Sequence, residues 1–403
     1  MDKRHKSASF EIRQIQDNRM TGQIKTPYYI IHEDKLRRNL ELISHVSEQS
    51  GAKIIMAFKA NALWKTFGII RDYCQASTAS SLNEMRLSLE FLGNDVHAYC
   101  PVYTDATIGE FVEGCSHIVF NSVAQYEKYR GFVDGYNSSN AAEKRVSCGL
   151  RVNPECSVIE TDIYNPCKPG SRFGVTRDVL GDVLPEGLEG LHFHCLCEST
   201  SYDLEKVLAA FEERFGEFLP RLKWVNMGGG HLMTREGYDT DHLIDLLRRF
   251  RAKYPNLEVI LEPGSAFTWR TGELVATVLD VVENQGVKTA IIDASFACHM
   301  PDCLEMPYKP AITEALAKPV HGKPTYRIGG NSCLSGDFIG DWSFDKPLAP
   351  GDVLTFEDMN HYTTVKTNMF NGIDHPSMVL LRSDGTVETL REFGYEDYRN
   401  RMD

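Results

Sequence analysis

Short runs of apolar and β-branched residues alternate with longer amphipathic or polar stretches along the first two thirds of the chain. Each run is typical of a buried strand, and each is followed by a helix-like or loop segment. The predicted strands are Lys53–Phe58, Tyr73–Ala76, Val96–Val102, His117–Asn121, Val146–Asn153, Leu188–His194, Lys223–Met227 and Glu258–Glu262. Eight such units predict an α/β fold in which the strands close into a (β/α)8 barrel. An open doubly wound sheet is the rival, disfavoured because no Gly-rich dinucleotide turn follows the first strand.

Two helices in this region carry start signals. Ser81 with Glu84, and Ser122 with Gln125, match the capping box, in which a serine and a residue three positions later bond the first backbone N–H groups. We therefore expect helices to begin directly after the two serines.

The pattern changes in the last third of the chain, where Pro and Gly separate shorter strand-like runs. These predicted strands are Val275–Val282, Val287–Ile292, Thr325–Ile328, Asp352–Phe356, Met378–Leu381 and Val387–Leu390. They predict a second, mainly antiparallel β domain. Pro27–Ile31 is also strand-like and precedes a predicted helix at Glu33–Ser47. We expect residues 33–267 to form the barrel, and residues 1–32 with 268–403 to form the β domain.

Composition and charge exclude several classes of protein. The 403 residues suffice for two domains, and a hydrophobic content of 42% allows a large core. The net charge of -13 without a basic stripe argues against nucleic-acid binding. An acidic chain would suit a cationic small substrate, but acidity also serves solubility. No apolar run approaches membrane-spanning length, and Met1–Phe10 lacks the apolar core of a signal peptide, so we expect no membrane association and a cytoplasmic protein.

The cysteines give no sign of a disulfide framework or a metal centre. Eleven are spread along the chain without tight spacing, which favours reduced thiols. Cys195 and Cys197 are the nearest pair, and no second Cys or His pair completes a zinc site around them. We therefore predict no metal.

Chemistry in a βα barrel sits at the C-terminal ends of the strands, and the predicted strand ends carry distinctive residues. Lys59 directly follows the first strand, where burial would lower its pKa and leave a neutral amine able to attack an aldehyde. His192 and His194 share one face at the end of the sixth strand, and one of them could stack on a flat ring. Taken alone, each residue has a plainer interpretation as a surface lysine or a core histidine.

Two further strand ends complete the pattern. The seventh strand runs into Gly228–Gly230, whose backbone could approach a phosphate, although three glycines also make a flexible turn. The eighth ends in Glu262, a carboxylate that could keep a pyridine nitrogen protonated, or that could form a helix cap or a salt bridge. Together the four signals supply an amine, a stacking ring, phosphate glycines and a pyridinium partner, which is a complete kit for pyridoxal phosphate.

The second half of the chain adds three candidates. Cys333 and Asp337 lie in a loop rich in Ser and Gly, where a thiol could give a proton to a carbanion. Cys333 could equally be an ordinary buried cysteine, since the chain has ten others. Tyr362 could bind a phosphate through its hydroxyl, or the hydroxyl could simply be the polar end of a core aromatic side chain.

As a set, these motifs resemble the fold-type III, alanine-racemase-like decarboxylases that depend on pyridoxal phosphate, a family that covers the ornithine, arginine and diaminopimelate enzymes. The order and spacing agree from about Thr26 to Gly394. The residues that carry the resemblance are Phe58-Lys59-Ala60, Phe193-His194, Gly228-Gly229-Gly230, Glu262-Pro263-Gly264, Cys333 with Gly336-Asp337, and Tyr362 with Phe370-Asn371-Gly372. Residues 57–64, 192–198 and 298–307 are most similar to the carboxynorspermidine/carboxyspermidine decarboxylase branch.

The resemblance implies removal of CO2 from carboxynorspermidine or carboxyspermidine in polyamine biosynthesis, with pyridoxal 5'-phosphate as cofactor. It implies that Lys59 forms a Schiff base with the cofactor, that His194 stacks on the ring, and that Glu262 pairs with the ring nitrogen. It also implies that Gly229 and Gly230 hold the phosphate.

The family's enzymes are dimers whose active sites lie at the interface, so the resemblance implies a homodimer here. Tyr362 would help to hold the phosphate, and Cys333 would return a proton to the α-carbon after CO2 leaves. Cys333 and the substrate-contacting Asp337 would act on the partner's cofactor.

Two departures from the family pattern stand out, one that bears on the substrate and one that bears on a contact to the cofactor's phosphate. Leu334 stands where diaminopimelate and ornithine enzymes carry an acid that touches substrate, which argues against both substrates. Ser265 replaces the Arg that follows Glu-Pro-Gly in ornithine-type enzymes. A long polyamine needs carboxylates to pair its ammonium groups; Asp302 and Glu305 are candidates, unless they belong to a solvated acidic loop.

Other functions remain open at this stage. One is a related basic amino-acid decarboxylase acting on diaminopimelate, ornithine or arginine, and another is a non-catalytic regulatory relative. The presence of Lys59, Cys333 and Asp337 disfavours a non-catalytic protein. Glu262 and Cys333 disfavour a racemase, because a strong electron sink suits loss of CO2.

Overall fold

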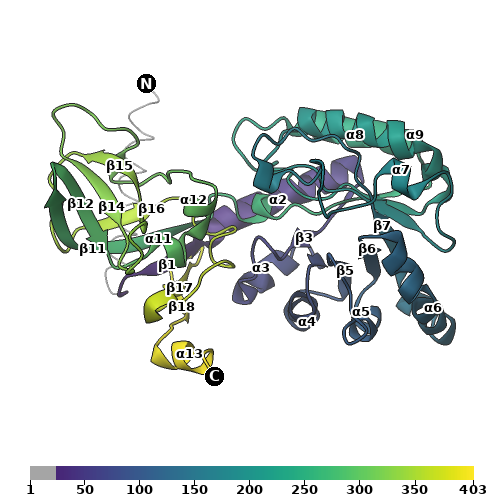
Figure 1. Ribbon diagram of the computed structural model, residues 1–403, viewed down its shortest axis with the longest axis horizontal. Coiled ribbons are helices and arrows are strands. Elements are labelled where there is room, and N and C mark those ends of the chain that lie inside the picture. Colours follow the sequence, from purple (N-terminus) through teal and green to yellow (C-terminus); the bar gives the residue numbers. More distant parts are fainter. Residues whose placement is uncertain (1–23) are drawn as a thin grey trace. The chain divides into compact units, whose positions relative to one another are not determined.

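The computed structural model describes residues 24–403, so the prediction for Met1–Phe10 falls outside the described residues. The chain forms two compact units (Figure 1). One contains Arg37–Trp269, and the other contains residues 24–36 together with Arg270–Asp403. No helix in the described part of the chain is long and apolar enough to cross a membrane.

The unit Arg37–Trp269 is a parallel barrel. Its strands pair in the order β2-β10-β9-β8-β7-β6-β5-β4-β3, and every pair is parallel. The strands are β2 (Lys53–Ile54), β3 (Met56–Ala57), β4 (Ala76–Ala79), β5 (Asp95–Tyr99), β6 (His117–Phe120), β7 (Ser147–Arg151), β8 (Gly190–His192), β9 (Trp224–Asn226) and β10 (Glu258–Leu261). Only Ile55 separates β2 from β3, so the two ends of the path are halves of one segment and the sheet closes on itself. The predicted barrel is confirmed.

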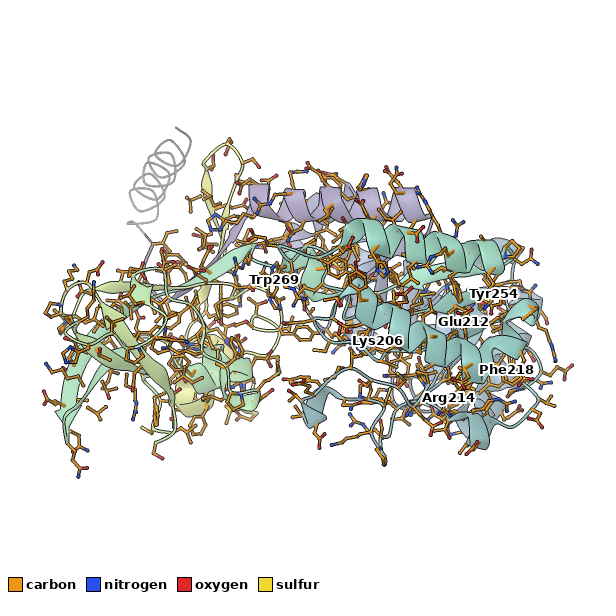
Figure 2. The ribbon with its side chains drawn as sticks, turned by 90° about the horizontal axis from the view of Figure 1, so that it is seen from above. Lys206, Glu212, Arg214, Phe218, Tyr254 and Trp269 are labelled. Carbon is orange, nitrogen blue, oxygen red and sulfur yellow. The ribbon has the colours of Figure 1, made fainter. Side chains whose placement is uncertain are left out.

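One helix precedes the first barrel strand, and others follow the strands around the barrel. They are α2 (Glu33–Ser50), α3 (Phe67–Arg71), α4 (Leu82–Phe91), α5 (Ile108–Gly114), α6 (Val123–Ser139), α7 (Arg177–Leu180), α8 (Ser201–Phe215), α9 (Thr240–Lys253) and α10 (Ser265–Thr268). The long helices α8 and α9 pack side by side, and Lys253 bonds Glu212 at 2.7 Å near their ends. Figure 2 shows Lys206, Glu212 and Arg214 along α8.

The predicted helix starts are correct, but the full capping boxes are not. The Ser81 hydroxyl accepts a hydrogen bond from the Glu84 backbone at 3.2 Å, and Ser122 accepts one from Gln125 at 3.3 Å. The return bonds go elsewhere: the Glu84 carboxylate accepts from the Ser80 backbone, and the Gln125 side chain accepts from the backbone of Tyr103. Each serine is therefore an N-cap whose second partner serves a neighbouring loop.

One barrel strand is misplaced in the sequence prediction. The backbones of Tyr73 and Cys74 donate to Ile70, so the apolar Tyr-Cys pair ends a helix, and the strand begins only at Ala76. The strand was not recognised in the sequence because Ser77 within it is polar, although it is buried. Its buried hydroxyl lies 2.8 Å from that of Ser88, which satisfies both groups inside the barrel wall.

The second unit is built on a mixed sheet with the order β13-β15-β14-β12-β11-β1-β17-β18, and β16 pairs with β11. The strands are β1 (Tyr28–His32), β11 (Gly272–Asn284), β12 (Val287–Ile292), β13 (Ala315–Leu316), β14 (Thr325–Gly329), β15 (Phe338–Phe344), β16 (Val353–Phe356), β17 (Ser377–Leu381) and β18 (Val387–Arg391). Only β1–β17 and β12–β14 are parallel pairs, so the predicted mainly antiparallel domain is confirmed. The sequence prediction missed β13 and β15. The helices of this second unit are α11 (Phe296–His299), α12 (Pro301–Glu305) and α13 (Tyr395–Asn400).

Candidate active site

Lys59 lies in the turn that directly follows β3, at the C-terminal end of the barrel strands. Its neighbour Phe58 is fully buried and bonds the backbone of Thr78 at the end of the adjacent strand. Lys59 is half-buried, and burial lowers the pKa of its amine, against the opposing charge of Glu262. Among residues 24–403, this lysine forms no ion pair. The expected shift toward a neutral amine is therefore present.

His194 faces Lys59 across the mouth of the barrel. Its Nε2 lies 3.4 Å from the Lys59 Nζ, and its Nδ1 accepts a hydrogen bond of 2.7 Å from the Gly229 backbone. Because Nδ1 is an acceptor, a neutral imidazole must carry its proton on Nε2. Burial is the main cause that holds the pKa of His194 well below its usual value, and the charge of Lys59 adds to it. A neutral imidazole therefore presents its N–H to the lysine amine.

The glycine run after β9 is required by the packing around it. A Cβ on Gly230 would lie 2.2 Å from the carbonyl oxygen of Leu196, and Gly230 has a φ of +87°. A Cβ on Gly229 would lie 2.6 Å from the carbonyl oxygen of Glu262. Both positions therefore exclude a side chain. The N–H of Gly229 is already donated to His194, so this glycine's contacts orient the imidazole.

Glu262 follows β10 and is 5% exposed. Its Oε2 accepts a hydrogen bond of 3.0 Å from Asn226 Nδ2, and its Oε1 lies 3.3 Å from His192 Nε2. Burial by itself would raise the pKa of the carboxyl, but the contact with His192 leads the interactions that bring the pKa well below the usual value. The site therefore holds a buried carboxylate anion.

Two residues that the sequence prediction missed share the layer below Glu262. Arg151, His192 and Asn226 are each the last residue of their strand, and they pair across the ladder in one row. All three are buried, which places a polar row inside the barrel. The predicted strands ran on to Asn153 and Met227, so Arg151 and Asn226 fell inside them and were not recognised as strand ends.

Arg151 contacts the backbone of His194 and two aromatic rings. Its guanidinium carbon lies 4.7 Å from the ring centre of Tyr99 and 4.6 Å from that of Phe173. It also donates a hydrogen bond of 3.2 Å to the carbonyl oxygen of His194. Aromatic faces stabilise a cation at such distances, so Arg151 is held in one orientation.

In the second unit, the Cys333 thiol is exposed on its loop. The backbone N–H of Cys333 donates to Asn371 Oδ1 at 2.8 Å, which ties two of the sequence motifs together. Asp337 is 4% exposed, and its carboxylate accepts hydrogen bonds from the Ser332 hydroxyl at 2.6 Å and the Ala297 backbone at 3.0 Å. These contacts hold the Cys333 loop and give no support to the prediction that Asp337 touches substrate.

The predicted polyamine-binding acids already have a cationic partner. Asp302 and Glu305 lie on α12, and both carboxylates bond the ammonium of Lys366. The two acids lie on a helix and share one ammonium group within their own unit, while Glu305 stays exposed to solvent. Tyr362 lies in the loop before Lys366 with a φ of +52° and its ring edge-on to His361.

A second cluster of lysine, histidine and acid lies at the opposite end of the barrel, where the strands begin. Asp95, His97 and His117 each place a potential ligand atom within 4.8 Å of the others. The ammonium of Lys53 is 2.6 Å from Asp95 and 3.2 Å from His97, so a cation already balances the carboxylate. The two imidazole rings stack at 3.9 Å and 20°, which keeps their lone pairs from converging on one ion.

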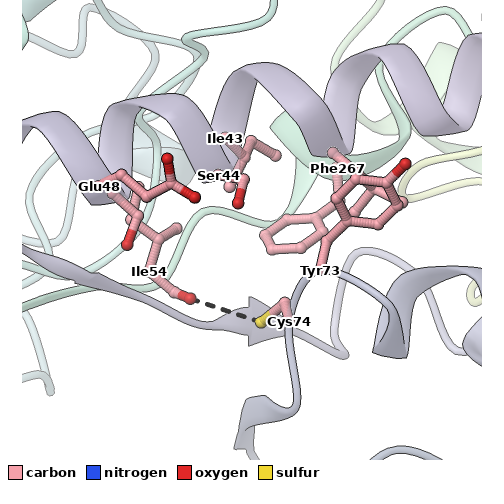
Figure 3. Close-up of a pocket in the computed structure, with 9 residues that line it drawn as sticks. Ile43, Ser44, Glu48, Ile54, Tyr73, Cys74 and Phe267 are labelled. Atoms are coloured by element: carbon pink, nitrogen blue, oxygen red, sulfur yellow. Dashed lines mark hydrogen bonds between the residues drawn. The ribbon is translucent and has the colours of Figure 1, made fainter.

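A small hollow beside α2 is not a substrate site. Figure 3 shows Ile43, Ser44 and Glu48 on the helix above Ile54 and Cys74, whose thiol donates to the Ile54 carbonyl at 3.4 Å. Its volume is about 60 Å³. Sites for small molecules are usually several hundred Å³.

Comparisons with known proteins agree with this geometry. The model of a family described as "pyridoxal-dependent decarboxylase, C-terminal sheet domain" matches residues 29–360. The chain is 44% identical to carboxyaminopropylagmatine decarboxylase of Synechocystis sp., over 98% of this chain and 100% of that protein. It is 40% identical to carboxynorspermidine/carboxyspermidine decarboxylase of Campylobacter jejuni, over 94% and 99%.

A solved structure extends the likeness to three dimensions. The crystal structure of carboxynorspermidine decarboxylase from Campylobacter jejuni, complexed with norspermidine, superimposes with a TM-score of 0.85 at 39% identity. The match covers 94% of this chain and 100% of that one. With its parallel barrel, its mixed sheet and its lysine facing a histidine and a buried carboxylate, the chain belongs to the family of pyridoxal-phosphate-dependent decarboxylases.

Proposed function

We propose that this enzyme removes CO2 from a carboxylated polyamine, and that Lys59, His194 and Glu262 carry the cofactor chemistry. The observation that supports it best is the half-buried Lys59, which faces a neutral imidazole at 3.4 Å and shares the barrel mouth with a buried carboxylate. A neutral amine is the form that reacts with an aldehyde. A buried anion is the group that holds a proton on a pyridine nitrogen.

The residues of the barrel fit pyridoxal phosphate. The amine of Lys59 would hold the aldehyde carbon, His194 would stack on the ring, and Glu262 would face the ring nitrogen. When bound, the cofactor supplies the electron sink for the electrons left behind by CO2. The glycines after β9 allow a close backbone approach, with Gly230 and Tyr362 as the proposed phosphate contacts and Gly229 orienting His194.

Three side chains of the protein set where protons are held or donated in this arrangement. Burial lowers the pKa of the Lys59 amine, which favours the neutral, nucleophilic form. Glu262 stays ionised, since Asn226 and His192 contact its two oxygens, and it would keep a proton on the ring nitrogen of the bound cofactor. Cys333 is exposed on its loop and would return a proton to the α-carbon once CO2 has left.

We further propose a homodimer in which Cys333 serves the partner's cofactor. Mixing the inactive variants Lys59→Ala and Cys333→Ala tests this arrangement. Random exchange of subunits gives hybrid dimers with one intact site, which restores about a quarter of wild-type activity. Sedimentation of the wild type as a monomer, or a mixture that stays inactive after confirmed subunit exchange, would contradict the shared site.

The substrate class follows from the relatives. Their names describe carboxyaminopropylagmatine, carboxynorspermidine and carboxyspermidine, all carboxylated basic chains. The present chain is acidic overall, and Asp302 with Glu305 already holds one ammonium group, that of Lys366. We propose that a substrate ammonium or guanidinium group competes with Lys366 for these carboxylates.

The deciding experiment is a CO2-release assay that compares these three compounds with diaminopimelate, ornithine and arginine. We expect kcat/KM for a carboxylated polyamine to exceed that for each amino acid by at least about 100-fold, because a site built to pair several cations rejects shorter substrates. Equal or better turnover of diaminopimelate would reject the proposal. It would favour the amino-acid alternative, which Leu334, 45% exposed in place of an acid, disfavours.

A further inference from the structure

The imidazole of His192 is buried beneath the proposed site without an aligned hydrogen bond. The residue is 1% exposed, and neither of its ring nitrogens makes a hydrogen bond within residues 24–403. Such a group is costly in a folded protein, so its presence needs a reason. The charged group nearest to it supplies one, since Nε2 lies 3.3 Å from Glu262 Oε1.

The strand register places His192 where it can act on Glu262 and on little else. His192 pairs with Asn226 across β8 and β9, and Asn226 bonds the other oxygen of the Glu262 carboxylate at 3.0 Å. Asn226 is itself fixed by the Gly228 backbone at 2.8 Å. Two side chains on neighbouring strands therefore hold the two oxygens of one carboxylate from below.

We propose that His192 is a positioning residue, which orients the Glu262 carboxylate toward the ring nitrogen of the bound cofactor. The inference rests on the role proposed above for Glu262. The His-Phe-His segment would then have two functions: His194 stacks on the cofactor ring, and His192 orients the Glu262 carboxylate.

The groups around His192 keep it neutral. Burial is the largest cause that lowers its pKa, Arg151 and Lys59 lower it further, and the charge of Glu262 opposes them. The ring also meets Tyr99 edge-on at 5.3 Å. A neutral imidazole has a single N–H, and placed on Nε2 it would face the carboxylate without cancelling its charge. Glu262 therefore remains an anion for the ring nitrogen.

Two amide substitutions separate positioning from mere filling of space. In His192→Gln the amide nitrogen reaches the position of Nε2, whereas in His192→Asn it reaches only the position of Nδ1. Each variant is loaded with pyridoxal phosphate labelled with ¹⁵N in the ring, and the ¹⁵N resonance is followed against pH. This resonance reports the proton on the ring nitrogen directly.

We expect wild type and His192→Gln to keep the ring protonated over the same pH range, and His192→Asn to lose the proton at lower pH. We also expect kcat to fall about tenfold in His192→Asn with KM within about twofold, since the lost interaction acts on the chemical step. His117→Gln, which removes an imidazole from the other end of the barrel, should leave the resonance unchanged.

Identical ¹⁵N profiles for His192→Asn, His192→Gln and the wild type would overturn the proposal. Glu262→Gln is the arm that tests the underlying assumption. If its resonance matches that of the wild type, the proposed role of Glu262 fails. If Glu262→Gln changes the resonance and His192→Asn does not, only the positioning role fails. Circular dichroism of each variant verifies that the barrel is folded.

Discussion

The two ends of the barrel carry the same kinds of side chain in different arrangements. Where the strands begin, the set is Lys53, Asp95, His97 and His117. Where the strands end, the set is Lys59, His192, His194 and Glu262. Each end thus has a lysine, two histidines and a carboxylate, which allows a comparison within one scaffold.

At the first end, the lysine and the carboxylate touch. Lys53 lies 2.6 Å from Asp95, and Asp95 also accepts a hydrogen bond of 2.6 Å from Ser116. The two histidines stack on each other instead of facing a cavity. Charge is balanced within the cluster, which leaves no reactive group and makes a structural role the natural interpretation.

At the second end, imidazoles contact the lysine and the carboxylate. Lys59 faces His194, Glu262 faces His192, and no ion pair joins the lysine to the glutamate within the described residues. Burial can therefore shift the lysine toward its neutral form, which a direct ion pair would prevent. The difference shows that the partner of a lysine, rather than its burial alone, decides whether it is structural or reactive.

The largest expected effect comes from the two lysines. Lys59→Ala should lower kcat by about 1,000-fold or more and abolish the yellow absorbance of the cofactor-loaded protein, because the amine that holds the cofactor is gone. Lys53→Ala should keep both within about twofold and lower the free energy of unfolding by about 1 kcal/mol, since its pair is partly exposed. Urea unfolding and CO2 release measure the two outcomes. A yellow, active Lys59→Ala would refute the assignment.

The carboxylates should differ next. Glu262→Gln should lower kcat by about 100-fold, as expected for loss of a buried charge that stabilises the transition state. Asp95→Asn should lower stability and leave kcat within about twofold, because its charge only balances Lys53. Steady-state CO2 release distinguishes them, and comparable losses of kcat in both variants would contradict the division into a reactive and a structural end.

The pH dependence of stability should report on the structural end alone, with no change in kcat. Burial lowers the pKa of His117 to about 2, below its value of about 6.5 in the unfolded chain. Its contribution to stability is therefore complete above pH ~6.5 and is lost as the pH falls toward the folded value, by up to about 1.4 kcal/mol per pH unit. His117→Gln should flatten the decline in unfolding free energy between about pH 6 and pH 4. An unchanged slope would show that His117 is not buried and neutral.

Much of the site could be predicted from local patterns. Lys59, His194 and Glu262 each follow a recognisable apolar run, and a strand end in a parallel barrel is a local feature of the chain. Arg151 and Asn226 also end strands, but the predicted strands ran on to Asn153 and Met227, so wrong strand boundaries hid them. The Tyr73–Ala76 error has the opposite origin, since small polar residues inside the barrel wall hid the true strand.

The sequence by itself determined the barrel, the mixed sheet and the candidates at the strand ends, because alternation and turn residues act over a few positions. Only the tertiary structure decided which groups meet. It bonded Asp337 to the Ala297 backbone, paired Asp302 with Lys366 and Lys53 with Asp95, and placed His192 beside Glu262. These partners lie on segments that are distant in the chain, and the register between neighbouring strands or loops, which no local pattern encodes, brings them together.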